Sequence, residues 1–290
     1  MSVRWDVPAS LDEALALRAE FGDEALLVAG GTFVGVLLST GLLTPDHVVA
    51  LNRLEALRSV AFDDDLVLGA MLTHSRLAAD RGIRHGWPAL AHAFEVVASP
   101  RIRNQATVAG VLGDADYASD PPAMFAALDA TVWLQSSAAG FRTVPAAEFV
   151  LGHYTTALAD DELITHVSVP SRWTASSYTK FRSRSSEDRP CVGVGIAARI
   201  KDGLVEELRV AIGAVADRPV MLPEVARLAD GHTPAASAST VADGFAELVD
   251  PISDHRGSAD YRRRLIRAGV RRGILALADS PDTGGDSGTT

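Results

Sequence analysis

Two glycine-bearing stretches hold the residues best suited to chemistry. Residues 26–34 read Leu-Leu-Val-Ala-Gly-Gly-Thr-Phe-Val, and the apolar-rich segment 34–43 follows. A short apolar strand, two glycines and a helix start are typical of a phosphate-binding turn. Glycine lets the backbone approach an anion, and the helix start offers unpaired N–H groups. An ordinary strand–helix turn with Thr32 as a simple helix N-cap explains the same residues without a ligand.

The second stretch, residues 106–113, reads Ala-Thr-Val-Ala-Gly-Val-Leu-Gly. It follows Arg101-Ile102-Arg103-Asn104 and precedes three carboxylates, Asp114, Asp116 and Asp120. We predict a small-residue loop here, without a helix. A dinucleotide is long enough to need two backbone contacts, so we expect both stretches to close on one diphosphate-bearing cofactor.

Composition excludes several classes of protein. The chain has 290 residues, of which 47% are hydrophobic and 22% charged, and this suits two or three packed units of a soluble protein. A net charge of −10 does not favour nucleic acid. The single cysteine, Cys191, excludes an intrachain disulfide and an iron–sulfur cluster held by this chain alone. We expect no membrane span, because no run of about twenty apolar residues exists, and we expect a cytoplasmic protein.

Periodicity predicts two α/β units before residue 172. Ser10 and Glu13 form a capping-box pattern that opens a helix through Phe21, and the first unit ends near Leu57. In the second unit we predict helices after Thr73, Pro88 and Pro121, with strands at 66–70, 131–134 and 163–169.

The pattern changes after a short polar stretch at 171–176. Strands are predicted at 178–181, 192–200 and 204–215, the last two joined by a turn at Asp202-Gly203. Helices follow around 222–228, 240–249 and 259–278. The predicted domains are therefore 1–57, 58–172 and 177–278, with a disordered polar tail at 279–290.

One motif is a decoy. Residues 193–198 match the dinucleotide fingerprint G-x-G-x-x-A, which lies between a strand and a helix in a true binding site. Here the sequence continues into a hairpin. We therefore interpret the match as chance, within a β pattern.

Several motifs, taken in order, resemble the FAD-binding medium subunit of the molybdenum hydroxylases, as in carbon monoxide dehydrogenase and xanthine dehydrogenase. The resemblance covers roughly Val7 to Ala278. It rests on five segments: Ala29-Gly30-Gly31-Thr32, residues 102–110 (Ile-Arg-Asn-Gln-Ala-Thr-Val-Ala-Gly), the acidic set Asp116, Ser119 and Asp120, the strand from Glu162-Leu163-Ile164 to Pro170, and Tyr178-Thr179-Lys180-Phe181.

The resemblance implies an α+β fold. A two-subdomain FAD-binding (PCMH-type) domain would precede a small α+β C-terminal domain with a three-stranded sheet and helices. It also implies an oxidoreductase subunit that binds FAD, without substrate turnover by the isolated chain. Electrons would come from iron–sulfur clusters of a small 2Fe-2S subunit, after oxidation of substrate on a large molybdenum cofactor subunit. A dimer of such heterotrimers is the family expectation. The substrate stays open, as does the choice of NAD or quinone as acceptor.

The resemblance also assigns the cofactor contacts, and it gives this chain no catalytic residue and no metal ligand. Around the first loop these contacts are Ala29, Gly30, Gly31, Thr32, Phe33 and Val34, of which Gly30, Gly31 and Thr32 would present N–H groups to the pyrophosphate. The second side of the cofactor would be held by Thr107, Ala109, Gly110 and Gly113. The ribityl group and the ring would meet Asp120, Leu163, Ile164 and Lys180. Simpler readings also stand: a helix cap for Asp120, core positions for Leu163 and Ile164, and an exposed strand lysine for Lys180.

Three residues depart from the family pattern. Phe33 and Val111 replace polar residues, and Ala109 replaces a glycine, which would crowd the backbone if that position needed a positive φ. Such losses would weaken FAD binding by about tenfold or more. They motivate an alternative function, an FAD-deficient subunit that scaffolds the same complex. A self-contained flavin oxidase is the third possibility.

Overall fold

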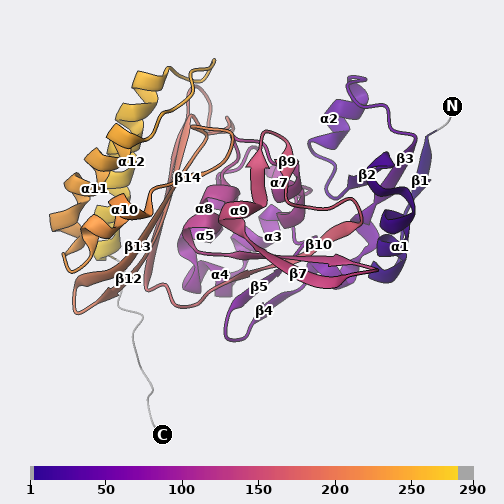
Figure 1. Cartoon of the computed structure of the whole chain (residues 1–290), viewed down its shortest axis with the longest axis horizontal. Coiled ribbons are helices and arrows are strands. Elements are labelled where there is room, and N and C mark those ends of the chain that lie inside the picture. The colour runs from indigo at the N-terminus through magenta and orange to yellow at the C-terminus, as the bar shows by residue number, and fades with distance from the viewer. Residues whose placement is uncertain (1–2, 280–290) are drawn as a thin grey trace, which may run out of the picture.

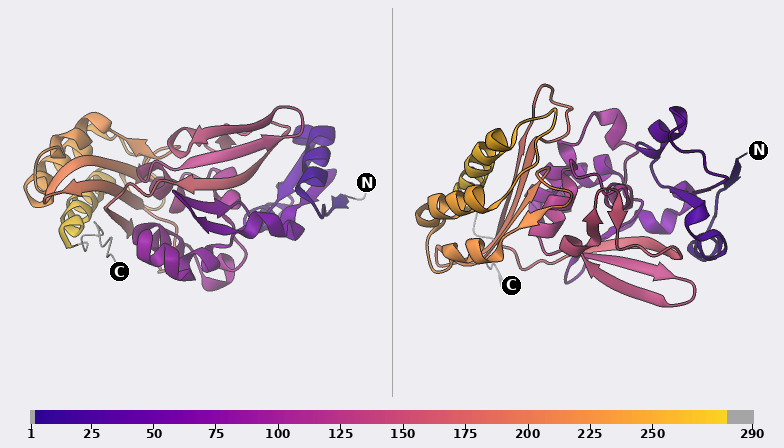
Figure 2. Two further views of the ribbon diagram at one scale, coloured as in Figure 1. Left: turned by 90° about the horizontal axis from the view of Figure 1, so that it is seen from below. Right: turned by 45° about the horizontal axis from the view of Figure 1, so that its top comes forward.

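The computed structural model describes residues 3–279 and arranges them as three units in a row, each with helices and a sheet, in the predicted α+β fold. The N-terminal unit lies at one end and the C-terminal unit at the other, with the second unit between them (Figure 1). The two further views in Figure 2 show the same order.

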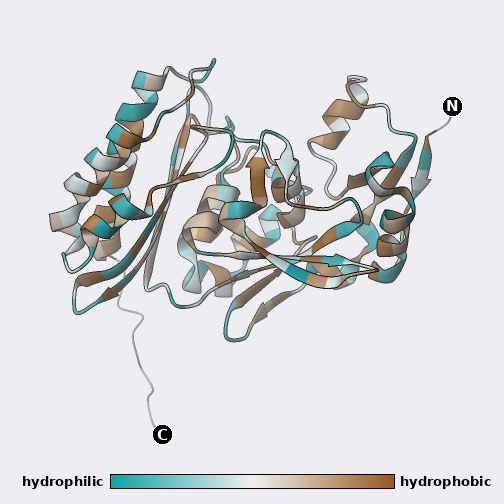
Figure 3. Ribbon diagram, in the orientation of Figure 1, coloured by the Kyte–Doolittle hydropathy of each residue, from teal (hydrophilic) through white to brown (hydrophobic). Residues whose placement is uncertain are grey.

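The N-terminal unit is a parallel sheet of β1 (Arg4–Asp6), β2 (Ala25–Val28) and β3 (His47–Ala50), in the order β1-β3-β2. Helix α1 (Leu11–Phe21) begins as predicted, with the Ser10 hydroxyl accepting the Glu13 N–H. The short helix α2 (Val34–Ser39) starts just after the two glycines. It is apolar along its length, yet none of its residues is fully buried, and it stands away from the rest of its unit (Figure 3).

The second unit is built on a five-stranded antiparallel sheet with the order β4-β5-β10-β6-β7. Its strands are β4 (Val60–Phe62), β5 (Leu66–Gly69), β6 (Thr131–Ser136), β7 (Gly140–Pro145) and β10 (Glu162–Val169), with a separate hairpin of β8 (Val150–Gly152) and β9 (Thr155–Thr156). The helices of this unit are α3 (His74–Ala79), α4 (Arg81–Gly86), α5 (Pro88–Glu95), α6 (Pro100–Arg103), α7 (Val108–Asp114), α8 (Pro121–Ala127) and α9 (Ala146–Phe149). Apolar side chains from these strands and helices form one core.

Helix α7 corrects a prediction, because residues 106–113 were expected to form a loop without a helix. The Thr107 side chain caps α7 by accepting the Gly110 N–H at 3.1 Å, and Ala115 ends the helix in the left-handed region with φ 46°. The prediction was wrong because a seven-residue helix with two glycines has weak intrinsic propensity. Its cap and its packing of Val108 and Leu112 hold it instead.

The C-terminal unit has four strands, so the predicted three-stranded sheet is also wrong. Strands β11 (Ala175–Phe181), β12 (Val192–Lys201), β13 (Leu204–Gly213) and β14 (Val220–Met221) pair antiparallel in that order. The strand that was missed, β14, has only two residues, too few to show a period-2 pattern. Helices α10 (Pro223–Ala226), α11 (Pro234–Leu248) and α12 (Ala259–Ala276) complete this unit. Apart from Asp279, the tail predicted to be disordered lies outside the described residues.

One glycine of the decoy motif, Gly195, lets two units approach closely. Gly193 and Gly195 lie within β12, as predicted, and not between a strand and a helix. A Cβ added to Gly195 would lie 2.9 Å from the carbonyl oxygen of Ala123 in α8. Helix α8 therefore packs on one face of the C-terminal sheet, while Gly269 and Gly273 bring α12 against its other face.

In the part of the chain from residue 3 to residue 279, the structure contains no helix with the length and apolar character needed to cross a membrane.

Candidate functional site

The structure brings the two glycine stretches into direct contact. A Cβ added to Gly30 would lie 1.9 Å from the carbonyl oxygen of Gln105, so only glycine fits there. A Cβ on Gly110 would lie 3.8 Å from that of Ala29. We call residues 29–34 the first loop and residues 104–110 the second loop. The two loops contact each other closely, although about 75 residues separate them in the sequence.

The first loop presents a run of unsatisfied donors. Gly31 turns the chain with φ 68°, a conformation that favours glycine. Among residues 3–279, the backbone N–H groups of residues 30–34 donate no hydrogen bond to a protein acceptor. The N-cap of α2 is Phe33, which makes no side-chain capping bond, so the simple N-cap role of Thr32 is not what the structure has. Consecutive free amides ahead of a helix are a common anion-binding arrangement.

The amides of the second loop are largely occupied. The N–H groups of Val108 and Ala109 donate to the carbonyls of Leu72 and Ala70, at 3.0 and 2.9 Å. The Gly110 N–H donates to Thr107 Oγ1. Within the described chain, only the Thr107 N–H of this segment lacks a protein acceptor. The second loop therefore supports the first and adds one backbone donor of its own.

Two of the three departures are accommodated. Ala109 lies in α7 without a positive φ, so its Cβ causes no crowding. Val111, also in α7, packs partly against the core. The third departure, Phe33, places an aromatic ring at the first loop where the family pattern has a polar residue. Its ring stacks on Tyr154, with centroids 5.7 Å apart and planes 14° apart.

A diphosphate-bearing cofactor fits this arrangement. The free amides of the first loop lie beside Gln105 and Ala106, and the free Thr107 amide follows directly in the chain. No acidic side chain belongs to either loop. Backbone donors without a competing carboxylate can hold an anion even in a chain of net charge −10.

The predicted ring contacts lie in β10. Leu163 and Ile164 are buried, at 1% and 7% exposure, and belong to the core as the simpler reading expected. The next residue links this strand to the second loop: the Thr165 carbonyl accepts the Ala70 N–H, and the Ala70 carbonyl accepts the Ala109 N–H, both at 2.9 Å. Gly113, in contrast, is exposed on α7. The contacts of these three residues with a flavin remain predictions.

Asp120 and Lys180 form a buried ion pair with each other, and their contacts with a flavin remain predictions. Lys180 Nζ lies 2.9 Å from Asp120 Oδ2 and also donates to the Val96 carbonyl. Tyr178 donates its hydroxyl to Asp120 Oδ1 at 2.8 Å. Asp120 occupies the N-cap position of α8, as the simpler reading had it, but its side chain makes no capping bond. The Lys180 side chain is 2% exposed, so the exposed-lysine reading is wrong. Both oxygens of Asp120 already have protein donors.

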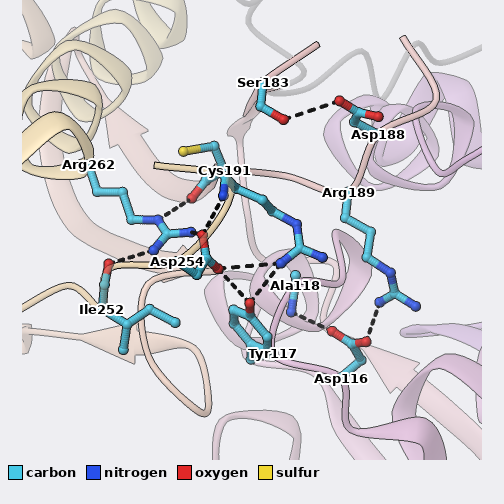
Figure 4. A network of polar contacts seen from close by, with 11 residues as sticks. Asp116, Tyr117, Ala118, Ser183, Asp188, Arg189, Cys191, Ile252, Asp254 and Arg262 are labelled. Atoms are coloured by element: carbon cyan, nitrogen blue, oxygen red, sulfur yellow. Dashed lines mark hydrogen bonds and ion pairs between the residues drawn. The ribbon is translucent and has the colours of Figure 1, made fainter. Parts of the chain in front are cut away.

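A second polar network connects the segment that follows α7 to the C-terminal unit (Figure 4). Asp116 accepts the Ala118 N–H and pairs with Arg189. Tyr117 donates to Asp254 at 2.6 Å, and Arg262 donates to Asp254, to the Cys191 carbonyl and to the Ile252 carbonyl. Although burial acts to raise the pKa of Asp254, the bonds from Tyr117 and Arg262 hold that pKa well below its usual range. The network links the second unit to the C-terminal unit.

Sequence reasoning missed three residues at the site. Gln105 meets Gly30 through its backbone, which no side-chain pattern reveals. Tyr154 stacks on Phe33 from a turn where its φ is 53°. His74 contacts the second loop from the start of α3, and the only available signal was its position after the capping residue Thr73.

Comparison with protein families assigns both parts of the chain. Residues 1–172 match the FAD binding domain in molybdopterin dehydrogenase, and residues 176–277 match the CO dehydrogenase flavoprotein C-terminal domain. The glyceraldehyde dehydrogenase medium chain of Sulfolobus acidocaldarius is 31% identical over 271 residues, covering 93% of this chain and 96% of that one. The carbon monoxide dehydrogenase medium chain of Hydrogenophaga pseudoflava is 30% identical over 278 residues, covering 94% and 96%.

Solved structures agree. A chain of quinoline 2-oxidoreductase from Pseudomonas putida 86 superposes with a TM-score of 0.89 at 30% identity, covering 96% of this chain and 98% of that one. A chain of carbon monoxide dehydrogenase from Hydrogenophaga pseudoflava gives 0.91 at 28% identity, covering 97% and 98%. With two contacting loops that suit a diphosphate, and with both domains matched along almost the whole chain, this protein belongs to the FAD-binding medium subunits of the molybdenum hydroxylase family.

Proposed function

We propose that this chain carries electrons through FAD between an iron–sulfur partner and an external acceptor. When bound, FAD supplies a carrier that takes up and releases two electrons. The chain has one cysteine, the buried Cys191, so the clusters that deliver electrons must belong to another chain. The relatives are medium subunits by name, which supports a small 2Fe-2S partner and a large molybdenum cofactor partner.

One observation carries the proposal: the free amides of residues 30–34 stand beside the second loop, where Thr107 adds another. The first loop would hold the pyrophosphate. The α2 dipole adds to these donors, since its positive end lies at Val34. The Phe33–Tyr154 stack would lie at the edge of the cofactor and limit its contact with water.

The experiment compares ligands that carry different parts of FAD: ADP has the diphosphate without the flavin, and riboflavin has the flavin without the diphosphate. The full chain is purified, its flavin is released and quantified, and the apoprotein is then titrated with FAD, ADP and riboflavin. We expect about one FAD per chain, competition by ADP, and much weaker binding of riboflavin, because riboflavin lacks the groups that the amides would hold.

Two results would argue against the proposal. Equal affinity for riboflavin and FAD would show that the loops do not hold the pyrophosphate. A colourless chain that still co-purifies with molybdenum and iron–sulfur partners would support the scaffold function instead.

A further inference from the structure

His74 is a buried residue that contacts the second loop twice. It begins α3 and is 1% exposed. Its backbone N–H donates to the Ala106 carbonyl at 2.9 Å, and its ring Nε2 lies 3.2 Å from the Thr107 carbonyl. The ring meets Phe94 edge-on, with centroids 4.7 Å apart. One residue therefore binds two consecutive carbonyls of the loop.

The hydrogen-bond partner of the His74 ring determines which ring nitrogen carries the hydrogen. A carbonyl oxygen can only accept, so Nε2 carries the proton and donates it to Thr107. The same carbonyl also accepts the Val111 N–H at 3.1 Å, as part of the first turn of α7. Both acceptor positions of the Thr107 carbonyl are thus used, one by its own helix and one by His74.

The bond to the Ala106 carbonyl sets the direction of the free Thr107 N–H, and the ring bond holds the peptide that follows. In a planar trans peptide the C=O and N–H groups point in opposite directions. Because the Ala106 carbonyl points at His74, the Thr107 N–H points away from α3. Gly30 lies against Gln105 and Ala106, so the first loop is next to this peptide.

We propose that His74 is a positioning residue for cofactor binding. Its backbone N–H fixes the 106–107 peptide, which carries the Thr107 N–H, and its ring fixes the following peptide through the Thr107 carbonyl. Held on both sides, Thr107 keeps its N–H directed toward the phosphate-bearing part of FAD. This inference rests on the proposed function, since it concerns the same site. His74 does not touch the cofactor, and it acts through the backbone of residues 106 and 107.

A matched pair of substitutions tests the role of the donated hydrogen bond. Glutamine and methionine have similar size and flexibility, but only the glutamine amide can donate. In the full chain, we expect His74→Met to weaken FAD and ADP binding by about three- to tenfold, which is the contribution of one hydrogen bond. His74→Gln should recover most of the loss, and His92→Phe, a change of a half-exposed histidine on α5, should have no effect.

The measurements are dissociation constants for FAD and ADP, together with the thermal unfolding midpoint of each apoprotein. The midpoint separates positioning from folding, because a purely structural role would lower the midpoint and leave the FAD and ADP affinity of the folded chains unchanged, whereas positioning lowers that affinity in chains that are folded. His74→Phe, which keeps the aromatic contact with Phe94, serves if the methionine variant does not fold. Equal FAD affinity in the wild-type chain and the methionine variant would overturn the role of His74 alone. Absence of FAD binding in the wild-type chain would instead overturn the proposed function.

Discussion

Lys180 Nζ lies 2.9 Å from Asp120 Oδ2, and this ion pair joins the strand β11 of the C-terminal unit to the start of α8 in the second unit. The two side chains are 2% and 3% exposed. Burial raises the pKa of the Asp120 carboxyl, and the neighbouring Lys180 acts against that change. Tyr178 completes the cluster with its own bond to Asp120. The Asp120–Lys180 pair therefore lies where the second unit contacts the C-terminal unit.

The first prediction follows from this pair. Lys180→Met should lower the free energy of unfolding by about 3–5 kcal/mol, because it leaves the Asp120 carboxylate buried without its cation. Denaturant unfolding of the full chain measures the change. Lys201→Met, a change of an exposed lysine at the end of β12, should stay within about 0.5 kcal/mol of wild type.

The double variant Lys180→Met, Asp120→Asn makes the test specific. If the two residues interact as the structure has them, the double variant loses less stability than the two single variants added together. Strict additivity, or a Lys180→Met chain as stable as wild type, would contradict the buried ion pair.

The second prediction concerns the contact between the loops. Gly30→Ala places a Cβ 1.9 Å from the Gln105 carbonyl oxygen, so one loop must move away from the other. We expect a loss of about 1–3 kcal/mol in stability together with loss of bound FAD. Flavin released per folded chain is the readout. Gly86→Ala is the control, since a Cβ there meets nothing within 4 Å. Full flavin content in Gly30→Ala would show that the loops need not touch.

The sequence predicts long, periodic elements better than short ones. Helix α1 and the hairpin of β12 and β13 carry a cap or a turn dipeptide and a clear period, and they form where expected. Helix α7 and strand β14 were missed. Helix α7 depends on the Thr107 cap and on tertiary packing, and β14 on pairing with β13, and neither effect is visible in local propensity.

The site was only partly predictable for a related reason. The glycine pattern located the first loop, because glycine reports where a backbone needs room. Which amides remain free depends on bonds between distant segments, such as Ala109 to Ala70, that no motif encodes. Asp120 and Lys180 illustrate the same limit. The resemblance suggested cofactor contacts for both, which remain predictions, but it did not reveal that the two side chains pair with each other.

The third prediction separates packing from ligand binding at the decoy motif. Gly195→Ala would set a Cβ 2.9 Å from the Ala123 carbonyl oxygen and push α8 off the C-terminal sheet. We expect a stability loss of about 1–3 kcal/mol, while chains that remain folded keep their full FAD content. Unfolding and flavin content are measured on the same sample. Loss of flavin without loss of stability would instead indicate a binding role for this glycine.

The last prediction is a pH dependence at the end of α7. Burial, and then the neighbouring Asp116, raise the pKa of the Asp114 carboxyl to about 7, while Arg189 acts in the opposite direction. Within residues 3–279, Asp114 Oδ1 is buried without a hydrogen-bond partner, which suits a protonated acid better than a carboxylate. Between the unfolded pKa, near 3.8, and about 7, the folded chain binds a proton that the unfolded chain does not. The folded state therefore loses stability as the pH rises through this window.

Asp114→Asn removes the titrating group and should therefore remove the loss of folding stability that Asp114 causes as the pH rises. The variant should match wild type near pH 4, become more stable than wild type as the pH rises because it lacks that loss, and exceed wild type by about 1–3 kcal/mol at pH 8, a range that allows for screening of a partly exposed group. Urea unfolding of both chains at pH 4, 6 and 8 gives the difference directly, and other titrating groups cancel in it. Asp63→Asn, a change in an exposed turn, should give a difference that does not vary with pH. If Asp114→Asn were less stable than wild type at pH 8, the carboxylate would have to be stabilised in the folded chain, and the buried, unpaired acid would be ruled out.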